Sequence, residues 1–500
     1  MTRGERANSL LLLALGFWPG TTAAQSWRLR VDAYAQRVAF RGVTPDSIAE
    51  ALVETGPTGG PVSPDGYAVN CFGDGFCRFY RPGPMRRGMP ASAGIDLTLW
   101  GLGVPGLSVR LGARTVTDLT GDRLWPGTSP GFRLLEGYAE YVRGGLTARA
   151  GRMLEQSRLG AAGTGGFDGV RATWRFDRTG LEVGGYAGWG LARGTILSVT
   201  SPAVNPLADF QPGHRQVVAG GLAGLHLRGL DAQAEYRREV DPFTDYFVSE
   251  RAALSVQARP ISRLRATAGA DYDLAQGEWG TAEGSLGWNG SRVRATLGGR
   301  HYRPFFDLWT VWGVFSPVPY NEVTASLAGT PIEKLSLRVR GELFRYENTA
   351  TSTPQVNLED HGWRWGVEAS VAPNPRWTVA ATGHGELLPG ASSRGADARV
   401  TWRPRDAVDL AVQGGSLERP LELRFQDAGV TWAGASADYR VAERWRFGLS
   451  VDRYWESRDR PDASAFDWNQ WRVSARISLV LRSDADRWVL PPARPAGLEP

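Results

Sequence analysis

Five histidines are the residues of this chain best suited to general acid–base chemistry. A hydrolase built on serine or aspartate needs a histidine that can take a proton from the nucleophile. None of the five lies in a recognisable Ser-His or Asp-His motif, no Cys/His spacing suggests zinc, and there is no Gly-Lys-Ser phosphate loop. We expect no catalytic residue, no metal and no cofactor, although a lipase or protease remains an alternative. The histidines are His214, His226, His301, His361 and His384.

Arginine and acidic residues recur at every second position of many short segments. Arginine can bind carboxylate or phosphate through two parallel hydrogen bonds, and rings of arginine inside a pore favour anions. The alternative is that these charges pair with one another across neighbouring strands and confer little selectivity. The candidate pore-lining residues are Arg149, Arg171, Arg175, Arg265, Arg338, Arg340, Arg364, Arg399, Arg446, Arg472, Arg476, Glu342, Glu368, Asp397 and Asp452, with Glu235 and Asp271 as further acids in the same phase.

Cys71 and Cys77 are the only cysteines, and they flank the short sequence Phe-Gly-Asp-Gly-Phe. In an exported protein, two cysteines so close together are expected to form a disulfide that closes a small loop. A redox-active or calcium-binding role for the Gly-Asp-Gly between them is the alternative.

The segments that carry these charges alternate with a period of two. Residues 471–482, WRVSARISLVLR, have tryptophan and aliphatic side chains at one set of positions and mostly arginine and serine at the other. Period two indicates a β-strand with an apolar and a polar face. Arginine at every second position is costly in a dry core and tolerated in a water-filled lumen, whereas the apolar face is favoured in lipid. The pattern therefore indicates a strand of an outer-membrane β-barrel. Tryptophans near strand ends, such as Trp377, Trp402, Trp445 and Trp471, fit its aromatic girdles.

Such segments recur from residue 93 to residue 482, and short turns alternate with long loops. One further strand is expected at 27–40. This predicts an all-β, antiparallel, up-and-down transmembrane barrel of about 22 strands, within a range of 18–22, with short periplasmic turns, long extracellular loops and both termini in the periplasm. The expected turns are 104–106, 144–145, 177–180, 228–229, 259–262, 289–291, 330–333, 372–375, 403–407 and 441–443; the long loops include 193–214, 303–319, 348–361 and 456–466.

The ends of the chain bound the barrel. Residues 1–24 have a basic start, an apolar stretch and a small-residue cleavage site, as a secretory signal peptide does. The barrel is expected over 25–482, with 41–92 as a long loop that could constrict the pore, and 483–500 as a C-terminal periplasmic tail. The formal charge of the 500 residues is +5, but the basic residues are spread along strands, so no nucleic-acid partner is expected.

Residues 137–176 contain Gly151-Arg152, a glycine-rich loop and then Phe167-Asp168-Gly169-Val170-Arg171. This order resembles the alginate-export type of outer-membrane channel. Met153 stands where that family usually has glutamine, and the family's barrels resemble an 18-strand design. The resemblance implies a porin-like barrel, with acidic saccharides as its solutes.

These observations predict a channel in the cell outer membrane for passive diffusion of small hydrophilic solutes, including anionic ones. The expected partners are the lipid bilayer, the barrel-assembly machinery and the solutes. A gated transporter with a small plug is a second alternative besides the enzyme. A large separate plug domain does not fit, because few residues separate the signal peptide from the strand at 93. Segment 41–92 is expected to fold inward and narrow the pore, and a lid over the outer mouth is the alternative.

Overall fold

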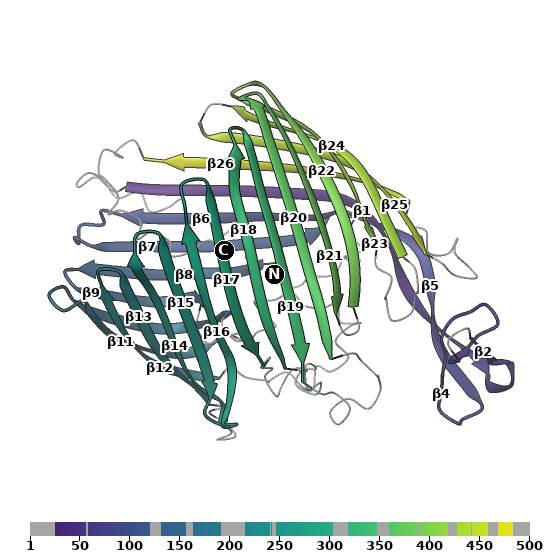
Figure 1. The fold of residues 1–500 in the computed structure, drawn as a ribbon, viewed down its shortest axis with the longest axis horizontal. Helices are drawn as coiled ribbons and strands as arrows, with labels where there is room; N and C mark the ends of the chain where they lie inside the picture. The colour runs from purple at the N-terminus through teal and green to yellow at the C-terminus, as the bar shows by residue number, and fades with distance from the viewer. Residues whose placement is uncertain are drawn as a thin grey trace, which may run out of the picture.

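A computed structural model of the protein shows a closed antiparallel barrel of 22 strands (Figure 1). The structure describes residues 26–56, 59–120, 132–156, 164–191, 216–240, 242, 247–303, 319–347, 360–388, 391–418, 428–441, 443–458 and 469–483. The barrel closes because β1 (Ser26–Ala49) pairs with β26 (Gln470–Arg482) on one side and with β6 (Pro90–Trp100) on the other. The expected strand number and architecture are confirmed.

The other strands follow one another around the barrel in sequence order, each paired with the next. They are β7 (Leu107–Asp118), β8 (Phe132–Arg143), β9 (Leu146–Gln156), β10 (Thr164–Phe176), β11 (Leu181–Gly190), β12 (Val217–Leu227), β13 (Leu230–Val240), β14 (Phe247–Ile261), β15 (Leu264–Asp273), β16 (Glu278–Asn289), β17 (Val293–Tyr302), β18 (Tyr320–Ile332), β19 (Leu335–Tyr346), β20 (His361–Asn374), β21 (Trp377–Leu388), β22 (Ala391–Arg405), β23 (Val408–Glu418), β24 (Ala428–Val441) and β25 (Trp445–Arg458).

Tight turns connect the strands at one end of the barrel, close to the ten expected positions. Gly229, in the turn between β12 and β13, has φ of +81°, a conformation that glycine adopts without steric cost. Lys334 closes the turn between β18 and β19 with φ of +72°. Turns of this kind leave little choice of register, so each hairpin fixes which side chains lie opposite each other.

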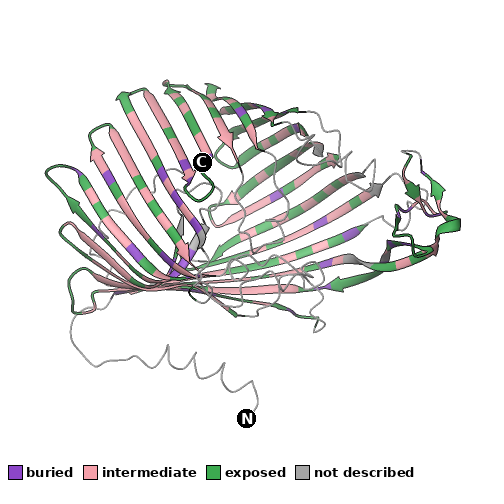
Figure 2. Ribbon diagram, turned by 90° about the horizontal axis from the view of Figure 1, so that it is seen from below, coloured by how far each residue is buried: buried purple, intermediate pink, exposed green. Residues whose placement is uncertain are grey.

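The side chains of several strands, such as β13, β18 and β24, alternate in exposure over part of their length, and Figure 2 shows colour bands of this kind. This is the period-two pattern expected from the sequence. None of the described residues forms a helix long and apolar enough to cross a membrane.

One hairpin is much longer than the others. β1 continues past the barrel to Ala49, and its residues Val38–Ala49 pair with β5 (Phe76–Gly88), which leads directly into β6. We call residues 38–88 the ribbon. At a rise of about 3.3 Å per residue, its paired part is about 40 Å long. In Figures 1 and 2 it projects beyond the long-loop end of the barrel.

The tip of the ribbon has a small core of its own. A short 3-10 helix η1 (Glu50–Leu52) and strands β2 (Glu54–Thr55), β3 (Pro61–Val62) and β4 (Asn70–Cys71) form this tip. Tyr67, Val69, Cys77 and Phe79 are buried there, and Cys71 forms a disulfide with Cys77. The covalent link supports a tip that buries few apolar side chains.

The ribbon differs from the inward fold expected for segment 41–92. The predicted strand at 27–40 begins in the expected place but extends to Ala49. β1 stays paired with β5 from the barrel out to Ala49, with one register shift between Arg41 and Val43. The segment therefore extends away from the barrel in the direction of its strands. Outside the described residues lie the predicted signal peptide, all of the predicted C-terminal tail after Ser483, loop 193–214 and His214.

Candidate functional site: the inner wall of the barrel

Side-chain type and cross-strand contacts show which face of the sheet is outside. On β19, Val339 and Leu343 expose 48% and 65% of their surface on one face, and Arg338, Arg340 and Glu342 share the other face. The inner face of a closed barrel is concave, so its side chains converge there, as when Arg399 on β22 reaches Ser436 two strands away on β24. The apolar side chains therefore form the outer surface, and the charged side chains form the inner wall.

Tryptophans frame the outer surface at two levels. Trp445 and Trp455 lie ten residues apart on β25 and both are exposed, at 39% and 43%. Ten residues extend about 33 Å along a strand, which at a tilt of about 40° spans about 25 Å, the height of the apolar band of outer-membrane barrels. The protein thus has the architecture of an outer-membrane barrel, with its short turns on the periplasmic side.

The cross-strand register places all 15 candidate pore-lining residues on the inward face. Direct partners include Arg149 with Arg171 and Glu342 with Arg364. Arg338 lies opposite Glu368, and Asp452 lies opposite Arg472. The remaining candidates keep the same phase: Arg175, Arg265, Arg340, Arg399, Arg446, Arg476 and Asp397.

Glu342 is the centre of an ionic cluster on this wall. It accepts from Arg364 at 2.9 Å and lies 3.1 Å from Arg340. Arg364 also donates to Glu386 at 2.9 Å, and Ser393 donates to the same carboxylate at 2.9 Å. Because its carboxylate is covered and shared by two guanidinium groups, Glu342 neutralises charge that the arginines would otherwise present to the lumen.

Other predicted wall residues are also paired. Arg338 lies 3.5 Å from Glu368, and both side chains are more than half exposed. Arg476 donates to Asp438 at 2.5 Å, and Arg149 pairs with Glu140. Asp397 accepts from Thr382, and Asp452 accepts from Gln413 at 3.0 Å and Ser450 at 3.2 Å.

Five predicted arginines have no ion pair with the carboxylates that the structure describes. Arg399 donates to the neutral groups of Gln413 at 2.6 Å and Ser436 at 3.2 Å, and Arg265 donates to Gln257 at 2.7 Å. Arg472 lies over the ring of Tyr454, 4.4 Å from its centroid. The other two are Arg175 and Arg446. Three of them, Arg265, Arg399 and Arg446, also have no carboxylate directly opposite in the register.

A row of tyrosines near the long-loop end was missed from the sequence. Tyr320 lies directly opposite Tyr302 and Tyr346, with ring centroids 5.2 and 5.3 Å away. Next to this row, Arg300 donates to Glu322 at 2.8 Å and to the Tyr320 hydroxyl at 2.7 Å. The three tyrosines lie at the ends of three neighbouring strands. A tyrosine at each strand end is visible in the sequence, but only the pairing register between the strands shows that the three rings lie side by side.

The two short motifs quoted from 137–176 come together on adjacent strands. Arg152 makes two hydrogen bonds to Asp168, at 2.8 and 2.9 Å. A side chain at Gly151, which has φ of +129°, would collide with the carbonyl oxygen of Gly137. Because side chains alternate along a strand, this ion pair lies on the face opposite to Arg149 and Arg171. It therefore belongs to the outer surface of the barrel and not to the inner wall.

Three of the histidines that the structure describes have polar partners close by. His226 is on the inner wall, with Nδ1 2.6 Å from Asp231 and Nε2 3.7 Å from Glu182. His301 pairs with Asn321 at 3.1 Å, and His361 with Asp360 at 3.2 Å. Within the ranges given above, no group of three or more metal-binding side chains is found.

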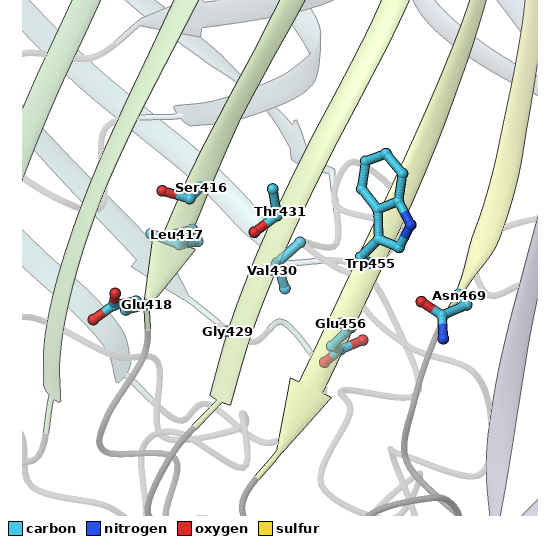
Figure 3. A pocket seen from close by; sticks show the side chains of 9 residues that line it. All are labelled: Ser416, Leu417, Glu418, Gly429, Val430, Thr431, Trp455, Glu456 and Asn469. Atoms are coloured by element: carbon cyan, nitrogen blue, oxygen red, sulfur yellow. The ribbon is translucent and has the colours of Figure 1, made fainter.

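A cavity of about 320 Å³ lies at the long-loop ends of β23, β24 and β25 (Figure 3). It is lined by Ser416, Leu417, Glu418, Gly429, Val430, Thr431, Trp455, Glu456 and Asn469. Its lining comes from both faces of the sheet, which places it at the rim and away from the Glu342 cluster.

No family model matches the chain. No curated protein matches it either. Solved structures with a similar fold include OpdK of Pseudomonas aeruginosa with vanillate, at 10% identity and a TM-score of 0.41, covering 92% of this chain and 99% of that one.

Two other similar structures come from the same bacterial genus. A BenF-like porin from Pseudomonas fluorescens has 9% identity and a TM-score of 0.40, with 92% of this chain and 99% of that chain covered. A mutant of the ferric enterobactin receptor PfeA from Pseudomonas aeruginosa has 12% identity and a TM-score of 0.49, with 92% and 81% covered.

Proposed function

We propose that this protein is an outer-membrane channel through which small hydrophilic solutes diffuse passively, with a preference for anions such as acidic saccharides. The observation that supports a channel is the charged inner wall of a closed barrel whose outer surface is apolar. A wall of this polarity is suited to water and dissolved solutes. The likeness of residues 137–176 to alginate-export channels motivates acidic saccharides as the solute class. The channel has no catalytic step and needs no cofactor.

The preference for anions rests on arginines whose charge no carboxylate balances directly. Arg399 and Arg446 are the clearest, because the first meets only neutral groups and the second lies opposite Arg440. Two like charges directly opposite each other repel, so an anion between them would be favoured. Paired residues such as Arg364 contribute less to this preference.

Planar-bilayer recording on refolded protein tests both parts of the proposal. The channel should conduct with a reversal potential that favours anions in a salt gradient. Replacing Arg399→Glu and Arg446→Glu together should shift the selectivity toward cations, whereas Arg86→Glu and Arg87→Glu in the ribbon should leave it unchanged. A folded barrel that does not conduct would refute the channel. Conduction with unchanged selectivity in the Arg399/Arg446 variant would refute the anion preference alone.

A further inference from the structure

The short-turn end of the barrel carries a band of exposed cations. Every short turn except the one after β6 has an arginine or lysine in it or at its edge. We call ten of these residues the basic collar. They are Arg143, Arg178, Arg228, Arg259, Arg263, Arg292, Lys334, Arg376, Arg405 and Arg444, and all ten are exposed.

The collar cations have no charged partner among the described residues. In the part of the chain that the structure describes, none of their side chains forms an ion pair or hydrogen bond, whereas the nearby Arg403 pairs with Asp409 at 2.7 Å. Only four acids lie in the same turns: Asp177, Glu333, Asp406 and Glu443. Over the residues that the structure describes, the rim is therefore a strongly positive surface.

Exposed tryptophans fix the depth of this surface in the membrane. Trp377 and Trp445 directly follow the collar residues Arg376 and Arg444 in sequence, and Trp288 lies four residues before Arg292. All three rings are on the outward face, with exposures between 39% and 44%. Tryptophan on the outer surface of a barrel lies at the level of the lipid headgroups. The collar therefore lies at, or just beyond, the headgroups of the periplasmic leaflet.

We infer that the basic collar binds the phosphate groups of anionic phospholipids in the inner leaflet of the outer membrane. Guanidinium groups bind phosphate through paired hydrogen bonds, and a basic surface at the headgroup level attracts anionic lipid. Each collar position should bind an anionic phospholipid about fivefold more tightly than a zwitterionic one. This factor corresponds to the free energy of about 1 kcal/mol with which one cation near the membrane surface attracts anionic lipid. This role is independent of the proposed conduction of solutes.

Tryptophan quenching by brominated lipid tests this inference on the mature protein refolded into vesicles. Two preparations of phosphatidylcholine vesicles would be compared, one with brominated phosphatidylglycerol and the other with the same mole fraction of brominated phosphatidylcholine. Quenching by the anionic lipid should exceed quenching by the zwitterionic one in the unmodified protein. In the variant R292Q/R376Q/R444Q, the ratio of quenching by the anionic lipid to quenching by the zwitterionic lipid should fall at least halfway to one. High salt should lower this ratio in the same way, because salt screens the charges.

A matched variant that also removes three arginines, R78Q/R86Q/R87Q in the ribbon, should keep the original ratio. Heat-modifiable migration on a gel would show that each variant has folded. A ratio of one in the unmodified protein, an unchanged ratio in the collar variant, or an equal fall in the ribbon variant would overturn the inference. A collar variant that alters anion conductance but not the lipid ratio would also overturn it, because the cations would then act on permeating solutes.

Discussion

At the scale of single residues, the strand β19 offers the sharpest test of which face is which. Val339 faces outward at 48% exposure, between the inward residues Arg338 and Arg340. Val339→Arg would place a charge in lipid, at a cost of roughly 2–4 kcal/mol near the bilayer midplane. We expect the variant to fold poorly into vesicles, as measured by heat-modifiable gel migration. Ser336→Arg, which faces inward on the same strand, should fold normally. Equal folding of both variants would contradict the assignment of faces.

Glu342 and Glu368 provide a matched pair of carboxylates on the inner wall. Glu342 is buried and holds two arginines, so Glu342→Gln should lower the free energy of unfolding by about 1.5–3 kcal/mol, the range for hydrogen bonds to charged groups. Glu368 is exposed and 3.5 Å from Arg338, so Glu368→Gln should cost about 0–1 kcal/mol. Denaturant unfolding in vesicles measures both. A cost for Glu368→Gln as large as that for Glu342→Gln would mean that burial does not govern these ion pairs.

At the scale of elements, the ribbon is a unit whose tip depends on one covalent link. The disulfide closes a loop with a sequence separation of 6, so its loss should destabilise the tip by roughly 2 kcal/mol on the loop-entropy relation. The variant Cys71→Ser with Cys77→Ser should be cleaved faster by protease between residues 50 and 75. The barrel itself should keep its melting temperature, since its strands pair independently of the tip. A matching loss of barrel stability would show that the two parts fold as one.

The ribbon should also respond to acid. The hydrogen bond from Arg81 holds the pKa of the Asp46 carboxyl below its ordinary value of 3.8. A carboxyl whose pKa is lowered on folding stabilises the fold above its ordinary pKa, and the contribution is lost as pH falls toward the lowered pKa. Hydrogen exchange at residues 44–49 and 76–81, corrected for intrinsic rates, should therefore speed up below about pH 4. Asp46→Asn should remove this dependence; if it persists, another group is responsible.

At the scale of the whole molecule, the closed barrel and the two levels of tryptophan predict the behaviour of the purified protein. The mature chain should begin near Gln25 and fractionate with the outer membrane. Its circular dichroism should be that of β-structure, and its gel migration should change on heating. A urea-unfolded sample is the control for the migration shift. A helix-rich protein recovered from the periplasm would be incompatible with the barrel.

Much of the fold was predictable because its determinants are local. Alternation along segments such as 471–482 identifies strands, and glycine, proline and asparagine identify the turns between them. Together they predict a 22-stranded barrel, which the structure confirms. The phase of each wall residue follows from the same alternation, which explains why Arg338 and Glu342 fall on one face.

Short stretches of sequence are enough to specify the strands, the turns and which face of each strand meets lipid or water, because each of these depends on neighbours within a few residues. The tertiary structure alone decided which arginines are neutralised. Arg364 reaches Glu342 and Glu386, whereas Arg399 reaches only neutral side chains, and this difference depends on register between strands. The direction of the ribbon also depends on tertiary structure, because the pairing of β1 with β5 extends it away from the barrel. The local sequence of 41–92 does not distinguish this arrangement from a segment that folds into the pore.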